Sequence, residues 1–275
     1  HVYCEKPLAP TLEAAERMAQ AAAQAGVRTQ VGFNYLCNPM LGLVRDLIRS
    51  GVLGEIRSYR GLHAEDYMAD AGSPFTFRHD PVGGGVLADL GSHALATAEF
   101  LLGPIEQVFG DCVTVIGHRP AGPDPRAVRT VEVDDITRAF VRFASGVSGS
   151  IEANWLATGR TMQHDFEIHG SRGSVVYTGE RLNEVWLYTI DDPAGQRGFR
   201  RIEAGPDHAP YGRFCVAPGH QLGFNDLKAI EVARFIDCIA TGSEEPFGFR
   251  AGVGIQRLVE TIRASAAAGS WQRVA

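Results

Sequence analysis

An aspartate and a histidine stand four residues apart in a stretch that is otherwise almost wholly apolar. They are Asp89 and His93, and a helix predicted over residues 85–102 contains both. Side chains at this spacing share one face of a helix, and a carboxylate beside an imidazole orients the ring and raises its basicity. The pair therefore has the arrangement of a general base with its orienting partner. An ion pair on a solvated face is the alternative, but the apolar neighbours favour a pair that lines a cleft.

A lysine lies where the first predicted strand ends. Lys6, in the tripeptide Glu5-Lys6-Pro7, directly follows the residues of that strand, 2–4. Ligands of open α/β sheets bind outside the carboxyl ends of strands. An ammonium group there could bond a substrate or cofactor hydroxyl and favour its deprotonated form. An exposed lysine ahead of a proline-started helix is the alternative.

Four further residues are candidates for binding a ligand rich in hydroxyl groups: Asn34, Tyr67, Arg78 and Trp155. Asn34 ends the second predicted strand, again at a carboxyl end, and the other three offer hydrogen bonds and an apolar platform. Each of them taken alone is more commonly structural. The interpretation as a binding site therefore depends on whether they converge on His93.

One glycine pattern imitates a dinucleotide-binding fingerprint. Gly83, Gly85 and Ala88 fit G-x-G-x-x-G/A, and Glu106 follows at a suitable distance. The fingerprint has to follow a buried strand, but the polar segment 77–81 precedes this one. The glycines are instead predicted to let the chain turn tightly into the helix. Gly91, within that helix, costs roughly 1 kcal/mol relative to alanine, which indicates that another group approaches the backbone closely.

The elements that would position these residues fall into two patterns. Residues 1–34 are predicted to form a strand, a helix over 11–25 capped by Thr11, and a second strand, a β-α-β unit of the kind that builds parallel sheets. Helices are also predicted over 39–50, 225–240 and 250–268, and a loop over 119–129. Period-2 strands are predicted over 56–63, 105–116, 134–143, 147–157, 164–169, 174–178 and 184–190. The predicted fold class is α/β at the start followed by α+β, with a large, mostly antiparallel sheet and flanking helices.

Composition excludes several classes of protein. The 275 residues are 45% hydrophobic and 21% charged, so the chain is not intrinsically disordered. The net charge of -6 argues against a general nucleic-acid binder, and no apolar run approaches the ~20 residues of a membrane span. The five cysteines are dispersed without a C-x-x-C pair, which indicates reduced thiols in a cytoplasmic protein and no metal site.

The order of these features resembles one family. Four features together resemble the glucose–fructose oxidoreductase / inositol dehydrogenase / rhizopine-catabolism (Gfo/Idh/MocA) family. They are Glu5-Lys6-Pro7 within a β-α-β unit, Gly84-Gly85 leading to Asp89-x-x-x-His93, the many-stranded domain, and the closing segments 235–242 and 264–266. The resemblance covers essentially the whole chain. It implies an oxidoreductase that uses NAD or NADP to interconvert a secondary hydroxyl and a ketone on a sugar or cyclitol.

The resemblance also assigns roles to the candidate residues. Lys6, Asp89 and His93 match the family's catalytic residues, with His93 taking the hydroxyl proton while hydride leaves for the nicotinamide. Cofactor contacts would come from Glu5, Lys6 and Pro7. Substrate contacts would come from Asn34, Tyr67, Arg78 and Trp155. Family members pair through the face of the large sheet, so a homodimer or homotetramer is expected, with residues 51–275 as the substrate-binding and oligomerisation domain.

The chain departs from the family at its start. The family's dinucleotide-binding domain opens with a strand, G-x-G-x-x-G and a helix, which this sequence lacks. Residues 1–50 are therefore expected to be the C-terminal remainder of a Rossmann domain. We expect a fragment of a longer protein rather than a naturally shortened homologue, and by itself it should bind NAD(P) weakly or not at all and be inactive.

Two other functions are compatible with the same sequence. A non-catalytic sugar-sensing homologue could keep the fold without turnover, although Lys6, Asp89 and His93 argue against it. A transhydrogenase-type enzyme would keep its nicotinamide tightly bound through purification. Substitution of His93 by alanine in the full-length protein separates a sensor, which would keep its function, from a dehydrogenase.

Overall fold

The computed structural model describes residues 1–122, 126–243 and 245–274. Its N-terminal part is a β-α-β unit in which β1 (Val2–Glu5) and β2 (Thr29–Gly32) pair in parallel around α1 (Leu12–Gln24). The predicted cap is confirmed, because the Ala14 amide donates to the Thr11 hydroxyl at 3.2 Å. The unit places the carboxyl ends of β1 and β2 side by side, which brings Lys6 and Asn34 to one edge.

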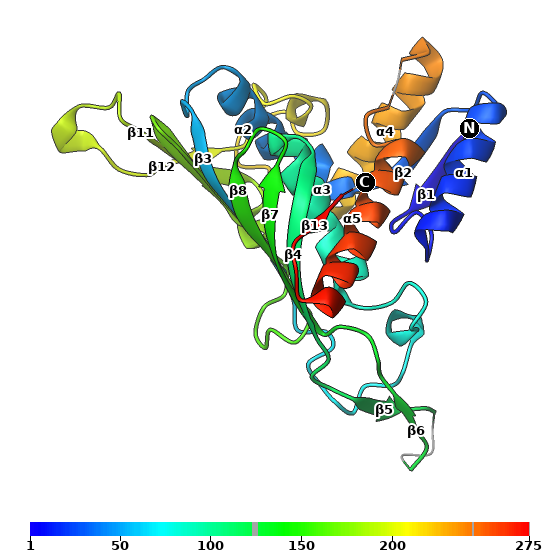
Figure 1. The fold of residues 1–275 in the computed structure, drawn as a ribbon. Coiled ribbons are helices and arrows are strands. Elements are labelled where there is room, and N and C mark those ends of the chain that lie inside the picture. The colour runs from blue at the N-terminus through cyan, green and yellow to red at the C-terminus, as the bar shows by residue number, and fades with distance from the viewer. Residues whose placement is uncertain (123–125, 244, 275) are drawn as a thin grey trace.

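A sheet of nine strands dominates the rest of the molecule (Figure 1). Its order is β12-β11-β10-β9-β3-β8-β7-β4-β13, and only the central pair β3–β8 is parallel. The predicted large, mostly antiparallel sheet is therefore confirmed. The strands are β3 (Ile56–Ala64), β4 (Ile105–Val113), β7 (Ile136–Phe143), β8 (Ser148–Asn154), β9 (Gln163–Gly170), β10 (Gly173–Tyr177), β11 (Glu184–Thr189), β12 (Arg200–Glu203) and β13 (Gln272–Arg273).

Side-chain alternation explains why helices cover one face of this sheet. Along β7, Ala139, Val141 and Phe143 are buried, whereas Arg138 and Phe140 on the other face are exposed. The helices on the buried face are α3 (Ser92–Leu102) and α5 (Phe249–Ala268) (Figure 1). The remaining helices are α2 (Pro39–Arg49) and α4 (Phe224–Thr241). One face of the sheet is thus part of the core, and the other is left open to solvent.

Helix α5 lies between the two sheets and packs on both. On β4, a side chain at Gly110 would come within 2.6 Å of the Ile262 carbonyl, so only glycine allows the helix to approach so closely. On the other side, a side chain at Gly252 would come within 2.9 Å of Val31 on β2. The last helix of the chain therefore joins the N-terminal unit to the large sheet.

The helix predicted over residues 85–102 is interrupted. Leu87–Gly91 forms a π-helical turn, and the α-helix proper, α3, starts at Ser92. A side chain at Gly91 would lie 2.8 Å from Leu87 and 3.3 Å from Ala153 on β8. The close approach that the glycine indicated is therefore the packing of this turn on β8. Single π turns inside helices are frequent at functional sites.

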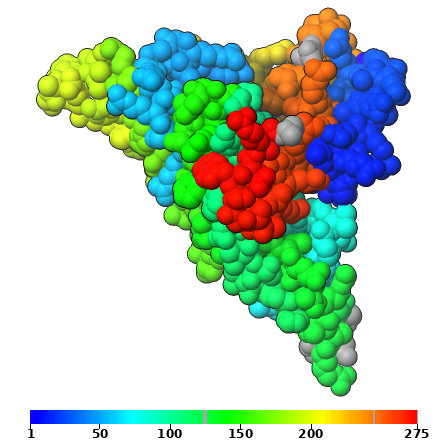
Figure 2. Space-filling view, viewed as in Figure 1, coloured from blue at the N-terminus to red at the C-terminus, as the bar shows by residue number. Residues whose placement is uncertain are grey.

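The loop predicted over residues 119–129 contains strand pairing at its ends. β5 (His118–Pro120) and β6 (Val128–Thr130) form a two-stranded antiparallel ribbon, and residues 123–125 lie outside the described part. Arg119 is fully buried and donates to the carbonyls of Met68 and Asp70 at 2.7 and 2.9 Å. The ribbon forms the lower tip of the molecule (Figure 2) and anchors the segment that carries Tyr67.

No helix among the described residues is long and apolar enough to cross a membrane. The five cysteines are free thiols. Within residues 1–122, 126–243 and 245–274, no group of three or more His, Cys, Asp or Glu side chains is placed to hold a metal ion.

Candidate active site

The Asp89 carboxylate is where the predicted site residues meet. One oxygen accepts from the Lys6 ammonium at 2.6 Å, and the other accepts from the Tyr67 hydroxyl and from Arg78 Nε, both at 2.7 Å. Lys6 also donates to the Asp89 backbone carbonyl at 2.6 Å. Four residues predicted from separate parts of the sequence are thus joined by hydrogen bonds at one point.

Different elements bring these side chains together. Lys6 follows β1, Asp89 lies in the π-helical turn, and Arg78 lies in a short 3-10 helix, Phe77–His79, on the segment that connects β3 to that turn. The guanidinium of Arg78 stacks on the exposed ring of Phe77, 4.7 Å from its centroid. The site therefore stands where the N-terminal unit touches the large sheet.

Electrostatics keep Asp89 ionised. Burial by itself would raise the pKa of Asp89, but the Lys6 charge and the hydrogen bonds from Lys6, Tyr67 and Arg78 lower it to about 2. Burial and the Asp89 charge raise the pKa of Tyr67 above its usual range, so its hydroxyl remains a donor. Asp89 is therefore a fixed negative charge that holds Lys6 in place.

The predicted hydrogen bond between Asp89 and His93 is absent. Both carboxylate oxygens are taken by other donors, and His93 Nδ1 is buried without a partner among the described residues. The expectation that Asp89 orients the His93 ring was wrong, because Lys6 takes one carboxylate oxygen and Tyr67 and Arg78 take the other. Lys6, rather than His93, is the direct partner of Asp89.

Aromatic and imidazole rings position His93 instead. Its ring centroid lies 4.6 Å from that of Tyr35, 5.9 Å from Phe33 and 5.7 Å from His63. Burial, the Lys6 charge and the neighbouring imidazoles hold the pKa of His93 well below its usual value. His93 is therefore a neutral imidazole that can accept a proton.

Sequence reasoning missed Tyr35, His63 and His164. His63 on β3 and His164 on β9 are directly paired in the sheet register, and their rings stack with centroids 4.7 Å apart. Tyr35 contacts both of these rings as well as His93. A signal was present in the strand alternation, since both histidines stand at inward-facing positions that apolar residues usually occupy.

The remaining predicted residues are placed in different ways. Trp155 is fully buried and donates its indole N–H to Asp135 at 2.7 Å, so the group expected to bind a ligand is already paired. The Trp155 ring also packs against the Tyr67 ring, with their centroids 6.2 Å apart.

The other predicted contact residues lie near the carboxyl ends of β1 and β2. Asn34 is buried, and its Nδ2 has no partner among the described residues. Glu5 accepts from Lys228 at 2.8 Å. Pro7 follows Lys6 and leads into the core at Leu8.

Two buried polar side chains near the carboxyl ends of β1 and β2 have atoms available to a bound group. Asn34 Nδ2 and His93 Nδ1 are buried polar atoms without a partner in the described part of the chain, and such atoms are rare in folded proteins unless water or a ligand satisfies them. Lys6 borders the same edge. These three residues are the ones that would hold the nicotinamide and the reacting group of a substrate.

The glycines before the π-helical turn shape the chain, as predicted. Gly83 and Gly85 have φ of +87° and +95°, and a side chain at Gly83 would lie 2.7 Å from Pro10. At Gly85 a side chain would collide with Asp134, whose carboxylate accepts from the Leu87 amide at 2.7 Å and caps the turn. These glycines serve the entry to the turn that carries Asp89.

Gly85→Ala is expected to destabilise the protein by about 2–3 kcal/mol, because it combines an unfavourable φ with a collision against Asp134. Gly254→Ala is the matched control, since Gly254 lies within α5 with open space around it and alanine favours helices by about 1 kcal/mol. Urea unfolding of both variants measures the difference. Equal stabilities would contradict this reading of the turn.

Comparison with known proteins places these features in a wider group. A family model described as the GFO/IDH/MocA C-terminal domain matches residues 42–176, and one described as an oxidoreductase family NAD-binding Rossmann fold matches residues 1–33. Levoglucosan dehydrogenase of Pseudarthrobacter phenanthrenivorans is 35% identical over 98% of this chain and 73% of its own length. A scyllo-inositol 2-dehydrogenase (NAD(+)) of Bacillus subtilis is 25% identical over 88% of this chain and 61% of its own.

Solved structures show the same architecture. A levoglucosan dehydrogenase in complex with NADH and levoglucosan superposes with a TM-score of 0.94 at 36% identity, over 99% of this chain and 73% of that one. The superposition therefore includes both the N-terminal unit and the large sheet.

Proposed function

Since the chain belongs to the GFO/IDH/MocA family of NAD-dependent oxidoreductases, we propose that its site oxidises a secondary hydroxyl of a sugar or cyclitol to a ketone, and catalyses the reverse reduction. The observation that carries the proposal is the convergence of Lys6, Tyr67 and Arg78 on Asp89. Beside them stands a neutral, buried His93. This set contains a proton acceptor and a fixed cation, the two groups that alcohol oxidation requires.

Each residue has a role in the proposed reaction. His93 accepts the hydroxyl proton, which its neutral imidazole allows. The Lys6 ammonium, held by Asp89, stabilises the negative charge that develops on the substrate oxygen. A bound nicotinamide would supply the acceptor for the hydrogen that leaves the carbon with its electron pair. In the reverse direction the protonated imidazole returns the proton to the oxygen.

The substrate class follows from the exposed part of the site and from the relatives. Tyr67 is 38% exposed and Arg78 is partly exposed, so both offer polar atoms to a ligand that approaches Asp89 from solvent. The names of the relatives include dehydrogenases of levoglucosan and of scyllo-inositol. We therefore favour a cyclic polyol, with Lys6 and His93 at the reacting hydroxyl, Asn34 beside it and Tyr67 and Arg78 at the others.

The proposed division of labour follows the two parts of the fold. Residues 1–50 would belong to the dinucleotide-binding domain and residues 51–275 to the substrate domain. A division of this kind is supported by the two family models, of which the Rossmann model matches residues 1–33 and the C-terminal one residues 42–176. Helix α5 crosses this boundary, since Phe249 donates its amide to the Thr29 hydroxyl at 3.0 Å. The site lies at the same boundary, where both substrate and cofactor can reach it.

The test is an absorbance assay of the native protein, expressed from its own gene, with NAD+ or NADP+ and a panel of cyclic polyols. Levoglucosan, scyllo-inositol and myo-inositol are the first substrates to try. Reduced nicotinamide should accumulate with at least one of them. No reduction with any sugar or cyclitol, by protein shown to bind the nicotinamide, would contradict the proposal and favour a sensing role.

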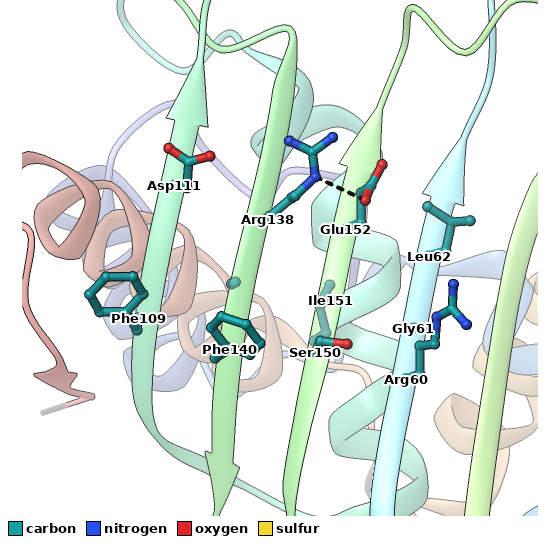
Figure 3. A pocket seen from close by; sticks show the side chains of 11 residues that line it. Arg60, Gly61, Leu62, Phe109, Asp111, Arg138, Phe140, Ser150, Ile151 and Glu152 are labelled. Atoms are coloured by element: carbon teal, nitrogen blue, oxygen red, sulfur yellow. Dashed lines mark hydrogen bonds and ion pairs between the residues drawn. The ribbon is translucent and has the colours of Figure 1, made fainter.

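We further propose that the open face of the large sheet pairs with a second copy of the chain. Figure 3 shows Phe109 and Phe140 on neighbouring strands of this face, beside the ion pair of Arg138 and Glu152. Phe140 is 60% exposed, and a face that carries aromatic rings together with both signs of charge can contact its own copy across a two-fold axis.

Phe140→Glu is expected to convert the homo-oligomer to a monomer, because this face of each copy would then carry three carboxylates, the new one with Asp111 and Glu152, against two arginines, Arg60 and Arg138. Light scattering after size-exclusion chromatography measures the mass. Val216→Glu, at a residue that is 84% exposed away from this sheet, is the control and should remain oligomeric. A wild-type monomer would contradict the proposed pairing.

A further inference from the structure

A histidine and a glutamate that the proposed reaction does not use form a pair beneath the Asp89 turn. His63, on β3, is fully buried, and its Nε2 lies 3.1 Å from Glu65 Oε1. Its other nitrogen, Nδ1, lies 3.2 Å from the Leu90 carbonyl oxygen. Leu90 follows Asp89 directly in the π-helical turn. The pair thus connects the solvent-facing end of β3 to the backbone that carries Asp89.

The hydrogen-bond geometry restricts where the protons are. A carbonyl oxygen only accepts, so the bond to Leu90 requires the proton on His63 Nδ1. In a neutral ring Nε2 then has only a lone pair, and the contact with Glu65 needs a proton on the carboxyl group. The alternative is a doubly protonated His63 facing an ionised Glu65.

The surroundings favour the neutral pair. Burial and the nearby Lys6 charge lower the pKa of His63 to about 3, which disfavours a second proton on the ring. Burial and the Asp89 charge raise the pKa of Glu65 to about 7, which disfavours its carboxylate. His164, stacked on His63, is also neutral, because burial and His63 lower its pKa. The charged groups that face Glu65 from the packed elements are Lys6, Arg78, Asp66 and Asp89.

The turn needs such a partner because a π-helical turn disturbs the regular ladder of helical hydrogen bonds. Of its carbonyl groups, that of Asp89 accepts from Lys6 at 2.6 Å and that of Leu90 accepts from His63. Two consecutive carbonyl groups of the turn are thus held by side chains from β3 and from the end of β1. Loss of either bond would let the Asp89 carboxylate shift relative to Lys6.

We propose that Glu65 is a positioning residue, which carries a proton on the acid side of neutrality and thereby holds His63 in the tautomer that fixes the turn bearing Asp89. The effect on turnover rests on the proposed function, whereas the location of the proton is a property of the protein alone. Glu65 is suited to exchange its proton with solvent, because its side chain is 20% exposed and His63 is fully enclosed.

Ionisation of Glu65 would undo this arrangement. A carboxylate would face the Nε2 lone pair of His63, and it would add a second negative charge near Asp89. Turnover should therefore fall as the pH rises through the folded-state pKa of Glu65, about 7. Stability has the same sign, since a folded-state pKa raised above its ordinary value gives stability that is lost as the pH rises through that folded value.

The first experiment locates the proton without substrate or cofactor. Carbon-13 carboxyl and nitrogen-15 imidazole resonances are followed over pH in the wild-type protein, and Glu65→Gln assigns the two signals. The expected result is a carboxyl group that titrates near neutrality and a His63 ring protonated on Nδ1 alone. Titration of Glu65 near the ordinary 4.5, or a doubly protonated His63, would overturn the proposal. Glu167→Gln is the matched control, because Glu167 faces His169 in an exposed pair on β9.

The second experiment separates positioning from packing. Glutamine can donate an N–H to His63 Nε2 at any pH, so Glu65→Gln should retain most of the turnover and lose the decline through neutrality. Glu65→Ala lacks the donor and should lower kcat by about 10²-fold, with a smaller change in KM. Equal losses in both variants, or an unchanged pH profile in Glu65→Gln, would overturn the proposal. If no polyol is oxidised at all, the proposed function fails, and the resonance experiment still decides where the proton is.

Discussion

Replacing His93 by alanine is expected to lower kcat for polyol oxidation by roughly 10²–10⁴-fold, the usual contribution of a positioned general base. The reason is structural, because His93 is the buried imidazole whose Nδ1 has no partner among the described residues. Its pKa lies well below the usual value, so the ring is unprotonated across the neutral range and its lone pair is free. Nucleotide affinity should change far less than kcat.

The measurement is steady-state kinetics of the native protein, with the unfolding temperature measured in parallel. Because alanine leaves a cavity in the core, His93→Gln provides a second variant of similar volume that cannot act as a base. His169→Ala is the control, since His169 is exposed on β9 and lies outside the site. Full turnover in folded His93→Gln would remove His93 from the mechanism.

Lys6→Met is expected to abolish most turnover and to destabilise the fold by about 3 kcal/mol, the lower end of the range for breaking a buried ion pair. The lower end applies because Tyr67 and Arg78 would still donate to Asp89. Loss of the cation also removes an influence that lowers the pKa of His93. Any remaining activity should therefore decline at a higher pH on the acid side than in the wild type.

The pH dependence of stability gives this prediction a second readout. Asp89 has a folded-state pKa of about 2, below its ordinary 3.8. Its stabilising contribution is thus complete above the ordinary value and is lost as the pH falls through the folded-state value. Without Lys6 the folded-state pKa rises, so Lys6→Met should show a smaller loss of stability on acidification.

Lys228→Met is the control for these stability measurements. The chain has one other lysine besides Lys6, Lys228, which forms a more exposed pair with Glu5 at 2.8 Å. Exposed pairs contribute about 0–1 kcal/mol. If Lys6→Met and Lys228→Met unfold at the same urea concentration, Lys6 is not the structural partner of Asp89 that the geometry indicates.

Local sequence signals predicted the elements well where they are strong. Alternating side chains located β3, β4 and the strands from β7 to β11, and Thr11 located the start of α1. The short strands β5, β6, β12 and β13 were missed because each has two to four residues, too few to show a period. The π-helical turn was missed because helical spacing continues across it in the sequence.

The sequence predicted which residues form the site better than it predicted their hydrogen-bond partners. Lys6, Tyr67, Arg78 and Asp89 were each identified from chemistry and position, and they do converge. Their partners could not be predicted, since Lys6 and Tyr67 reach Asp89 from 83 and 22 residues away in the chain, and no local pattern shows such contacts. Trp155 was predicted to contact the substrate, but its pairing with Asp135 depends on a contact between strand ends that no local pattern reveals.

The position of α5 has a consequence for how the polypeptide matures. The contact between Phe249 and Thr29 joins residues 220 apart in the chain, and Val31 packs against the same helix at Gly252. The N-terminal unit leaves the ribosome long before α5 does, so β1 and β2 lack their packing contacts with α5 during that time. We expect residues 1–33 of the nascent chain to stay sensitive to proteases until α5 has been synthesised. Truncation before α5 should therefore leave the N-terminal unit unfolded and bound by chaperones, although α5 is far from this unit in the sequence.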